Sequence, residues 1–511
     1  MTALSVPEGI ALHIALRIPS GIPKGTALSR ASHRASHPVG DPAGDPEGGV
    51  PEGIAGRPRF HLVSLGCAKN TVDSESMATL LARDGFQATT EAAKADVLIV
   101  NTCGFIAPAR DESMRHLRQL AADKKSGQLL IAAGCLTQRY GAEVARQVPG
   151  VDGLLGTRRW MDIVELVHRL RRGQAPALRY DLPPAPTVGR DERGVLRAAV
   201  QGASAYLKIA DGCRRPCTFC AIPAIKGTAV SRPLPTLVDE VRQLEQLGVR
   251  EVILIAQDTT DYGHDLGMRH GLAALLEALL SAAPAIDWFR VLYAYPGAVT
   301  ERLIDVMASE PRLLAYLDMP LQHAHPAVLR RMRRPANMTS VVRTLQRLRH
   351  ARPGMALRTT FIVGFPGETE DEFETLMDFV DEMRFDRVGV FPFSFEPGTA
   401  SEPLGDPVPA EVKEDRRRRL MEKQQQISLE ANQAQVGRVL PVLIEGIDGA
   451  LSIGRSYRDA PEIDGLVIVE GEIPPGELAP VRITGAMAYD LTGVVEVSPE
   501  PVIIRSAITV T

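Results

Sequence analysis

The residues most able to do chemistry in this 511-residue chain are six cysteines, which fall into two groups of three. One group is compact, with the spacing Cys-x3-Cys-x2-Cys, and the members of the other lie 36 and 32 residues apart. A disulfide scaffold would be shorter and denser in cysteine, so clustered thiols in so long a chain favour metal binding. The spread trio is Cys67, Cys103 and Cys135, and the compact trio is Cys213, Cys217 and Cys220.

The compact trio directly follows a strand-like segment at 206–210. A structural zinc site usually has four ligands in two pairs, whereas three thiolates on a cubane four-iron cluster leave one iron without a protein ligand. The spacing resembles that of radical S-adenosylmethionine (SAM) enzymes. In those enzymes the open iron binds the amino and carboxylate groups of SAM, and an electron from the cluster cleaves SAM to a 5′-deoxyadenosyl radical.

The spread trio follows three predicted strands of an alternating β/α segment. Each cysteine comes directly after an apolar run, and glycines stand beside all three. Parallel strands place their C-terminal ends at one edge of a sheet, so we expect the three thiols to converge there. One such cysteine alone would be a small buried residue, but three equivalent ones favour a shared ligand. The predicted elements are strands 60–65, 96–100 and 129–133 and helices 70–83 and 109–122, the first with Asn70 or Thr71 as N-cap.

The β/α alternation continues beyond the compact trio. Six units are too few for a closed eight-stranded barrel, and they fit the open partial barrel of radical SAM cores. The segment from Thr360 to Glu368 ends the fifth strand and enters a helix, and it resembles the segment that lies along the SAM adenine in this superfamily. The predicted strands are 206–210, 251–256, 289–293, 315–319, 356–362 and 387–393.

The two ends of the chain depart from this α/β pattern. Residues 1–57 are rich in Pro and Gly and lack the basic start of a secretory signal, so we expect a disordered extension. Residues 432–511 have short alternating β-like runs, which predict a small β-barrel. There is no run of roughly 18 or more apolar residues, so no membrane span is expected. The formal net charge of −4 does not indicate a nucleic-acid binder.

This order of parts resembles the radical SAM methylthiotransferase family over residues 58–511. The resemblance implies an α/β fold with a Rossmann-like N-terminal domain, a partial (β/α)6 radical SAM barrel and a small C-terminal β-barrel of the TRAM type. The implied division is a disordered extension at 1–57, an N-terminal methylthiotransferase domain at 58–171, a linker at 172–200, a radical SAM core at 201–431 and a TRAM-like barrel at 432–511.

The same resemblance implies the cofactors and partners. Each cysteine trio would hold a four-iron cluster, and SAM would serve as both methyl donor and radical source. The open iron of the N-terminal cluster would carry the sulfur or methylthio group for an unactivated C–H bond. An electron donor such as flavodoxin or ferredoxin is expected, and the enzyme is expected to be a cytoplasmic monomer without a membrane partner. The residues implied for the SAM pocket are Tyr206, Phe219, Gln322 and Gly364.

Two branches of this family compete for the chain. One modifies an adenosine of tRNA next to the anticodon. The other, the RimO-type branch, modifies the β-carbon of an aspartate in small-subunit ribosomal protein S-twelve, alone or in the ribosomal subunit. The stretches at 206–213, 219–223, 291–296 and 316–323 resemble the second branch. Arg214 departs from it, because an acidic residue often follows the first cysteine there, and this alters the charge expected to face the substrate.

The charge of the C-terminal segment favours the protein substrate. Residues 432–511 contain five Arg and no Lys against eleven Asp plus Glu, a formal net charge of −6. This field would oppose phosphate binding, which relies on Lys and Arg, whereas an acidic barrel suits a basic ribosomal protein. A tRNA adenosine methylthiotransferase is the alternative within the family, and a non-catalytic iron–sulfur redox sensor is the alternative of another class.

Overall fold

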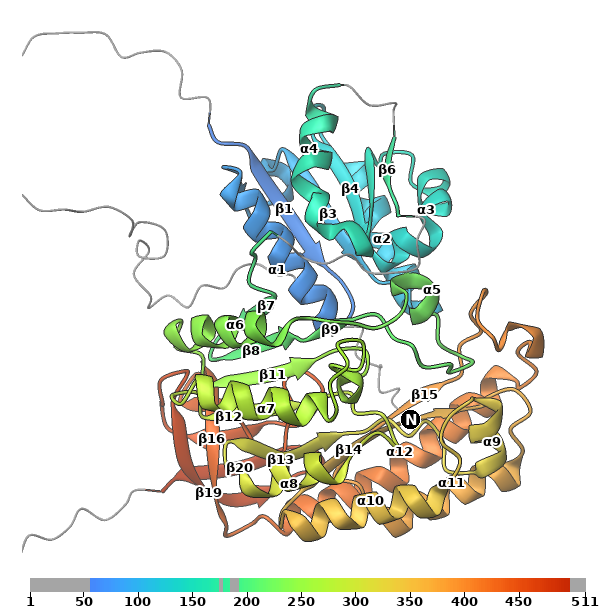
Figure 1. The fold of residues 1–511 in the computed structure, drawn as a ribbon, viewed down its shortest axis with the longest axis vertical. Coiled ribbons are helices and arrows are strands. Elements are labelled where there is room, and N and C mark those ends of the chain that lie inside the picture. Colours follow the sequence, from blue (N-terminus) through green and yellow to red (C-terminus); the bar gives the residue numbers. More distant parts are fainter. Residues whose placement is uncertain (1–55, 174–177, 184–192, 497–511) are drawn as a thin grey trace, which may run out of the picture.

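The computed structural model describes residues 56–173, 178–183 and 193–496. The disordered extension predicted at 1–57 therefore falls almost wholly outside the described residues. The described chain forms three parts that follow one another in sequence: an N-terminal domain, a core and a small barrel (Figure 1). The predicted α/β architecture is confirmed. Among the described residues, the helices lack the combination of length and apolar character that a membrane crossing requires.

The N-terminal domain is a doubly wound parallel sheet. Its strands are β1 (Arg59–Ser64), β2 (Gln87–Ala88), β3 (Val97–Thr102), β4 (Leu129–Gly134), β5 (Gly153–Gly156) and β6 (Arg179–Asp181), and its helices are α1 (Ala68–Arg83), α2 (Ala107–Asp123), α3 (Cys135–Gln147) and α4 (Ile163–Arg171). The strand order is β2-β1-β3-β4-β5-β6. α1 and α4 cover one face around Ile99, and α2 and α3 cover the other around Val100. β3 is buried along its whole length, because helices cover both faces of this parallel sheet.

The core is an open sheet of six parallel strands with an antiparallel β7 at one edge, in the order β15-β14-β13-β12-β11-β8-β7. Its strands are β7 (Ala198–Gln201), β8 (Ser204–Lys208), β11 (Glu251–Ile255), β12 (Trp288–Val291), β13 (Leu313–Asp318), β14 (Ala356–Val363) and β15 (Arg387–Pro392). Its helices are α5 (Ile222–Lys226), α6 (Leu234–Gln246), α7 (Gly271–Ala282), α8 (Glu301–Ser309), α9 (Pro326–Arg331), α10 (Met338–Ala351), α11 (Glu370–Met383) and α12 (Ala410–Gln433). The six parallel strands match those expected from the sequence within a few residues at each end.

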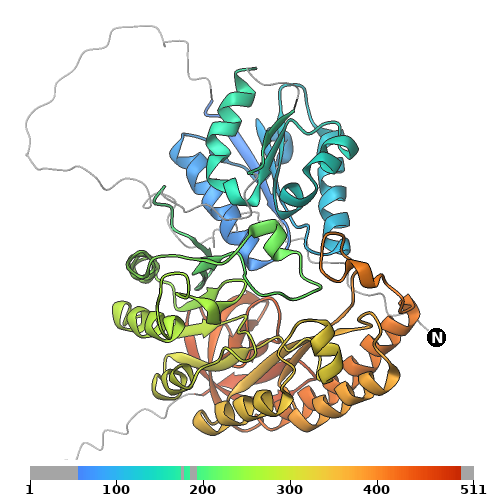
Figure 2. The same cartoon turned by 45° about the vertical axis from the view of Figure 1, so that its right-hand side comes forward.

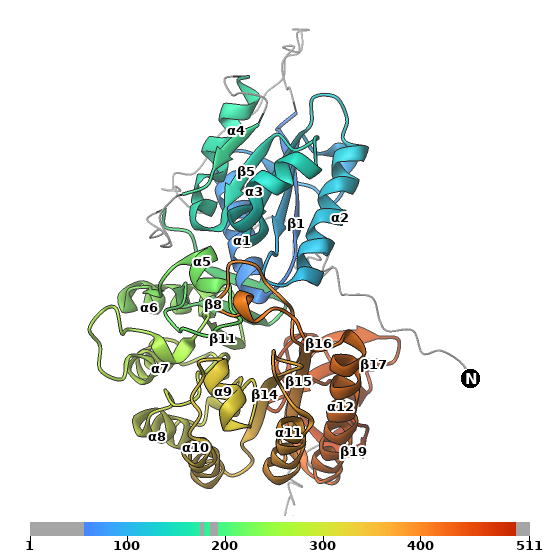
Figure 3. The same ribbon diagram turned by 90° about the vertical axis from the view of Figure 1, so that its right-hand side faces the viewer.

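The C-terminal part is a closed barrel in the order β16-β17-β18-β20-β19, and it lies beside α12 (Figure 3). Its strands are β16 (Val439–Asp448), β17 (Leu451–Ser456), β18 (Val467–Glu470), β19 (Leu478–Ala486) and β20 (Leu491–Val495). The barrel is fixed to the core by buried ion pairs: Arg455 bonds Glu251 at 2.6 Å, and Arg458 bonds Asp386 at 2.7 Å. Leu443 and Ala460 of the barrel also pack against the core sheet.

The N-terminal domain stands on one end of the core, with α5 at the junction (Figure 2). The segment between them was predicted as a linker at 172–200, and its described ends join the two sheets. β6 pairs with β5 of the N-terminal sheet, and β7 pairs with β8 of the core sheet. Strand pairing at both ends of this segment anchors the two domains where the chain passes from one to the other.

Candidate active site

The compact cysteine loop is held between two short strands of the core, β9 (Ala210–Asp211) and β10 (Val230–Ser231), which pair antiparallel. Gly212 opens the loop at φ +77°, and a Cβ there would collide with the carbonyl oxygen of Thr228. Only glycine meets both demands, because it tolerates positive φ and has no Cβ. The backbone N–H of Cys213 then donates to the Gly227 carbonyl at 3.0 Å. The first thiol is therefore set by the backbone itself.

The turn after α9 fixes the other end of this loop. Thr218 donates its backbone N–H to the Met332 carbonyl at 3.1 Å and its hydroxyl to the Arg331 carbonyl at 3.0 Å. From the same turn, Arg334 directs a guanidinium N–H to the Sγ of Cys217 at 3.6 Å. This contact fixes the position of the Cys217 sulfur relative to the turn after α9.

Two arginines between the cysteines bind carboxylates on the following segment. Arg214 makes a bidentate pair with Asp261, and Arg215 bonds Asp258 at 2.6 Å. Arg214 was noted in the sequence as a departure from the family. Asp261 neutralises the positive charge of Arg214, although the Arg214 side chain remains 40% exposed. These pairs tie the cysteine loop to the segment that follows β11.

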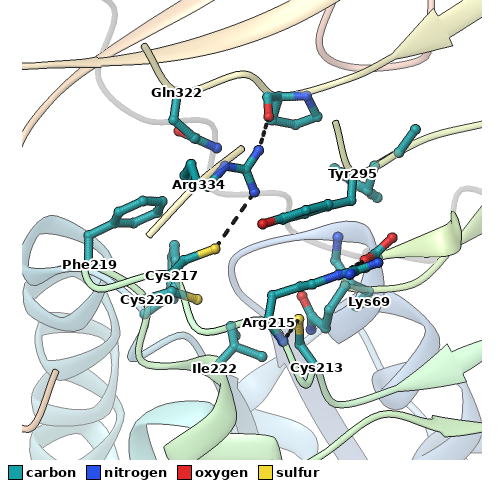
Figure 4. A pocket seen from close by; sticks show the side chains of 16 residues that line it. Lys69, Cys213, Arg215, Cys217, Phe219, Cys220, Ile222, Tyr295, Gln322 and Arg334 are labelled. Atoms are coloured by element: carbon teal, nitrogen blue, oxygen red, sulfur yellow. Dashed lines mark hydrogen bonds and ion pairs between the residues drawn. The ribbon is translucent and has the colours of Figure 1, made fainter. Parts of the chain in front are cut away.

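A cavity of about 230 Å³ lies over this loop, and all three cysteines of the compact trio line it (Figure 4). The Tyr295 ring stands between two guanidinium groups, 4.1 Å from that of Arg215 and 4.3 Å from that of Arg334. Lys69 and Phe105 of the N-terminal domain also line the cavity. It lies at the C-terminal ends of the core strands, where open α/β sheets bind ligands.

Two of the four residues expected in the SAM pocket line this cavity, Phe219 and Gln322. Gln322 has φ +75°, which is uncommon for a residue other than glycine. Its backbone is held there by β14, since its N–H donates to Thr360 O and its carbonyl accepts from Ile362 N, both at 2.8 Å. Backbone strain that the surrounding structure enforces is often found at functional sites.

The other two residues expected in the SAM pocket, Tyr206 and Gly364, do not line this cavity. The structure does not support Tyr206 as a pocket residue: it is buried on the sheet face that the barrel covers, and its hydroxyl donates to the Pro461 carbonyl at 3.4 Å. Gly364 ends β14 at φ +70°, and a Cβ there would collide with the Lys413 side chain. Gly364 does not line the cavity, so its contact with SAM stays a prediction.

The spread trio lies at the adjoining edge of the N-terminal sheet, one cysteine after each of β1, β3 and β4 as predicted. Gly66 has φ +95°, and a Cβ there would lie 2.8 Å from the Cβ of Cys103. Gly134 has φ +98°, and a Cβ there would meet the Thr102 carbonyl at 2.6 Å. The glycines beside the cysteines thus allow the strand ends to approach one another closely.

Asn70 joins these strand ends, a role that the sequence did not reveal. Its side-chain amide donates to Leu65 O at 2.9 Å and to Thr102 O at 3.0 Å. Its own carbonyl accepts from Asn101 at 2.9 Å, and its side-chain oxygen lies 3.7 Å from the Sγ of Cys135. The N-cap prediction was wrong, because α1 begins at Ala68 and Asn70 turns inward. The signal in the sequence that could have revealed this role is a polar residue, Asn70, three positions after the first cysteine.

The three thiols of the spread trio differ in acidity. Burial, together with the charges of the other two sulfurs, raises the pKa of Cys103 to about 12. Burial also raises the pKa of Cys135, to about 11. Cys67 is accessible to water but lies between two domains, so desolvation of its thiol raises the pKa, while Lys69 and Lys226 and backbone N–H groups lower it by more. The net pKa of Cys67 is below its usual value.

A buried ionic network joins the two cysteine regions. Asp73 of α1 bonds Arg197 at 2.6 Å and Lys208 at 2.7 Å, and Lys226 lies 3.0 Å from Asp211 and 3.4 Å from Asp73. Burial opposes ionisation of Asp73, but the three cations outweigh it and hold its pKa well below the usual range. Breaking one partner of such a network is costly because it leaves a buried charge uncompensated.

Neither trio resembles a zinc site. Within the described parts of the chain, no three His, Cys, Asp or Glu side chains are arranged to hold a single metal ion. The chemistry of the donor set instead fits a larger inorganic group, since each trio presents three sulfurs and N–H groups point at two of those in the compact trio. An open (β/α)6 sheet with such a loop after its first parallel strand defines a radical SAM enzyme.

Comparison with known families gives the same order of parts. The uncharacterized protein family UPF0004 matches residues 59–156, the radical SAM superfamily matches 207–380 and the TRAM domain matches 436–495. Among solved structures, the radical SAM methyltransferase TsrM from Kitasatospora setae has a TM-score of 0.50 at 15% identity, covering 77% of this chain and 81% of that one. At that identity the likeness concerns the fold.

The curated relatives are far closer in sequence. The protein named ribosomal protein uS12 methylthiotransferase RimO from Chloroflexus aurantiacus is 50% identical over 452 residues, covering 85% of this chain and 99% of the relative. Its namesake from Roseiflexus sp. is 47% identical and covers 85% of this chain and 96% of the relative. The chain belongs to the RimO family of radical SAM methylthiotransferases.

Proposed function

We propose that the protein transfers a methylthio group to the β-carbon of an aspartate in small-subunit ribosomal protein S-twelve. The observation that carries this proposal is the shared cavity. Lys69 and Phe105 of the N-terminal domain line the same space as the compact trio, and Lys69 follows Cys67 by two residues. The cysteines of the spread trio do not themselves line the cavity, but Lys69 and Phe105 each lie two residues from one of them, so a substrate in this space would lie beside the spread trio. The choice of ribosomal protein S-twelve as the substrate follows the names of the relatives.

We assign a four-iron cluster to each trio. Cys213, Cys217 and Cys220 would hold the cluster that binds SAM, and the spread trio would hold the second; the chain has no further cysteine to complete either set. When bound, these groups together with SAM supply a 5′-deoxyadenosyl radical and a methylthio donor. The electron for this chemistry is proposed to come from flavodoxin or ferredoxin, and the enzyme is proposed to act as a cytoplasmic monomer.

The protein residues around the cavity have three tasks in this proposal. Phe219 and Gln322 position SAM against the compact trio. Arg334 balances negative charge at the Cys217 sulfur. Tyr295, enclosed by two guanidinium groups, closes the wall between them and limits access of water to the radical. The ionic network around Asp73 holds the N-terminal domain against the core beside the cavity. It thereby fixes the position of the spread trio relative to the compact trio.

The charge of the barrel supports a protein substrate over tRNA. Arg455 and Arg458 are buried in ion pairs with the core carboxylates Glu251 and Asp386, and Arg455 also pairs with Glu445 of the barrel, so these cations do not reach the barrel surface. Asp459 and Asp464 of the barrel are likewise buried, in ion pairs with Arg387 and Arg358 of the core, so the described surface of the barrel keeps the acidic balance of its sequence. A basic ribosomal protein is attracted to such a surface, and an RNA backbone is repelled. The exposed acids are Glu445, Asp448, Glu462, Glu470, Glu472 and Glu477.

The proposal is tested by mass spectrometry of ribosomal proteins and of tRNA from cells with the gene, without it, and with the gene carrying Cys213→Ala. We expect a methylthio group on an aspartate of ribosomal protein S-twelve only in cells with the intact gene, and unchanged tRNA in all three. A methylthio group that follows the gene in tRNA and not in the ribosomal protein would contradict the proposal.

A further inference from the structure

Lys69 extends from the N-terminal domain into the cavity of the core. It lies in the first turn of α1, two residues after Cys67, and its side chain lines the cavity together with the compact trio (Figure 4). Only 6% of the residue is exposed. A side chain from the domain of the spread trio thus lines the cavity that the compact trio lines.

The ammonium group of Lys69 has weak contacts for a buried charge. Its Nζ lies 3.4 Å from the Ala256 carbonyl oxygen and 3.2 Å from the centroid of the Tyr293 ring. Within the described residues, Lys69 forms no ion pair with a carboxylate. The charge of Lys69 favours the thiolate of Cys67, but no carboxylate of the described residues pairs with it. A buried ammonium is costly without a close anionic partner, so this position favours binding of a further anionic group from outside the chain.

The ring beneath Lys69 is held in place by strained backbone. Tyr293 has φ +63°, the left-handed region that residues other than glycine rarely adopt. Asp318 accepts the Tyr293 N–H at 3.2 Å, and the Tyr293 carbonyl accepts the Thr259 N–H at 3.1 Å. The structure therefore enforces a costly conformation at the residue that supports the ammonium, as is common at binding sites.

The other charged residues lining the cavity have partners near the compact trio. Arg215 bonds Asp258, and Arg334 lies against the Cys217 sulfur and donates to the Pro320 carbonyl. Their positions suit the compact trio and the SAM bound there. Lys69 enters the cavity from the domain that carries the spread trio and, within the described residues, has no carboxylate partner, so it can bind a different anion.

We propose that Lys69 forms a carboxylate-binding subsite for the side chain of the target aspartate. This inference rests on the proposed function. The reacting β-carbon of an aspartate is bonded directly to its carboxyl carbon, so holding the carboxylate at Lys69 fixes the β-carbon between the two trios. A tRNA adenosine has no carboxylate to offer, so the subsite also selects the class of substrate.

The test measures binding of purified ribosomal protein S-twelve, in its natural form and with the target Asp→Asn, to the reconstituted enzyme in the presence of SAM. The wild-type enzyme should bind the aspartate form about 10- to 100-fold more tightly, as expected for a desolvated charge pair. Lys69→Met should bind both forms equally, and Lys69→Arg should recover part of the preference. Lys94→Met is the matched control, because Lys94 is exposed in the same domain, and it should behave as wild type.

The circular dichroism spectrum and the thermal unfolding midpoint of Lys69→Met should stay close to those of wild type, which shows that the variant is folded. Equal binding of both forms by the wild-type enzyme would overturn the inference without reference to any variant. Tenfold weaker SAM binding by Lys69→Met would also overturn the inference, because Lys69 would then bind SAM. Loss of iron from this variant would overturn it as well, because Lys69 would then be a counter-ion of a cluster. If the wild-type enzyme modifies the ribosomal protein yet shows no preference, the inference fails and the proposed function stands. If it modifies only tRNA, the function itself fails.

Discussion

The two cysteine trios reach similar donor sets by different structural means. The compact trio lies on one loop, whose local bonds include Cys220 N–H to Cys217 O at 3.2 Å. The spread trio depends on the sheet, because its strand ends meet only in the observed register, which pairs Thr102 with Gly134. A local motif tolerates changes elsewhere in the fold, whereas a site built from strand ends is sensitive to any change that alters their approach.

The trios also differ in electrostatics. Burial raises the pKa of Cys213 to about 11 and that of Cys220 to about 12. In the spread trio, Lys69 and Lys226 outweigh desolvation at Cys67 and lower its pKa. The spread trio therefore contains one thiol whose pKa is below its usual value, beside two whose pKa values are raised.

The largest effect is expected from replacing Cys213, Cys217 and Cys220 together with Ala. Wild-type protein reconstituted without oxygen should hold about eight irons and eight sulfides, from two four-iron clusters. The triple variant should hold half of each and cleave no SAM, since the loop is local and the N-terminal sheet is left intact. Iron analysis and assay of 5′-deoxyadenosine measure both quantities. A triple variant that keeps its full iron would show that the compact trio holds no cluster.

An intermediate effect is expected from Asn70→Ala, which removes the amide that joins two strand ends without touching a cysteine. Loss of two buried hydrogen bonds should lower the free energy of unfolding by about 1–3 kcal/mol. Iron should fall toward half, while SAM cleavage persists. Asn337→Ala is the control, because Asn337 caps α10 on the surface and its loss should cost about 1 kcal/mol and no iron. Equal iron in both variants would argue against a sheet-dependent site.

The smallest effect concerns thiol reactivity in iron-free protein. Thiolate is the reactive form, so a lowered pKa raises reactivity at neutral pH and a raised pKa delays it to more alkaline pH. Cys67 should be alkylated by iodoacetamide first near pH 7, and Cys103, Cys135, Cys213 and Cys220 should react only as the pH rises. Peptide mass spectrometry at several pH values measures the order. Alkylation of Cys213 as fast as Cys67 at pH 7 would remove the electrostatic difference between the trios.

The sequence predicted what depends on chain order and missed what depends on tertiary contact. Apolar runs located the strands, and the position of a cysteine after each strand placed both trios at sheet edges. Strand alternation divides β8 between two faces, and only the docked barrel shows that Tyr206 lies on the covered face, outside the cavity. The sequence did not identify Lys69 as a cavity residue, because Lys69 belongs to the N-terminal domain and the cavity lies in the core. No local sequence pattern marks a side chain that extends from one domain into another.

The central claim is that the two trios serve one cavity with separate tasks. The most direct test is the variant with Cys67, Cys103 and Cys135 all replaced by Ala, assayed together for 5′-deoxyadenosine and for methylthiolated ribosomal protein. We expect reductive SAM cleavage to remain measurable, because the compact loop is untouched, and methylthio transfer to fall below detection. Methylthiolated product from this variant would contradict the claim.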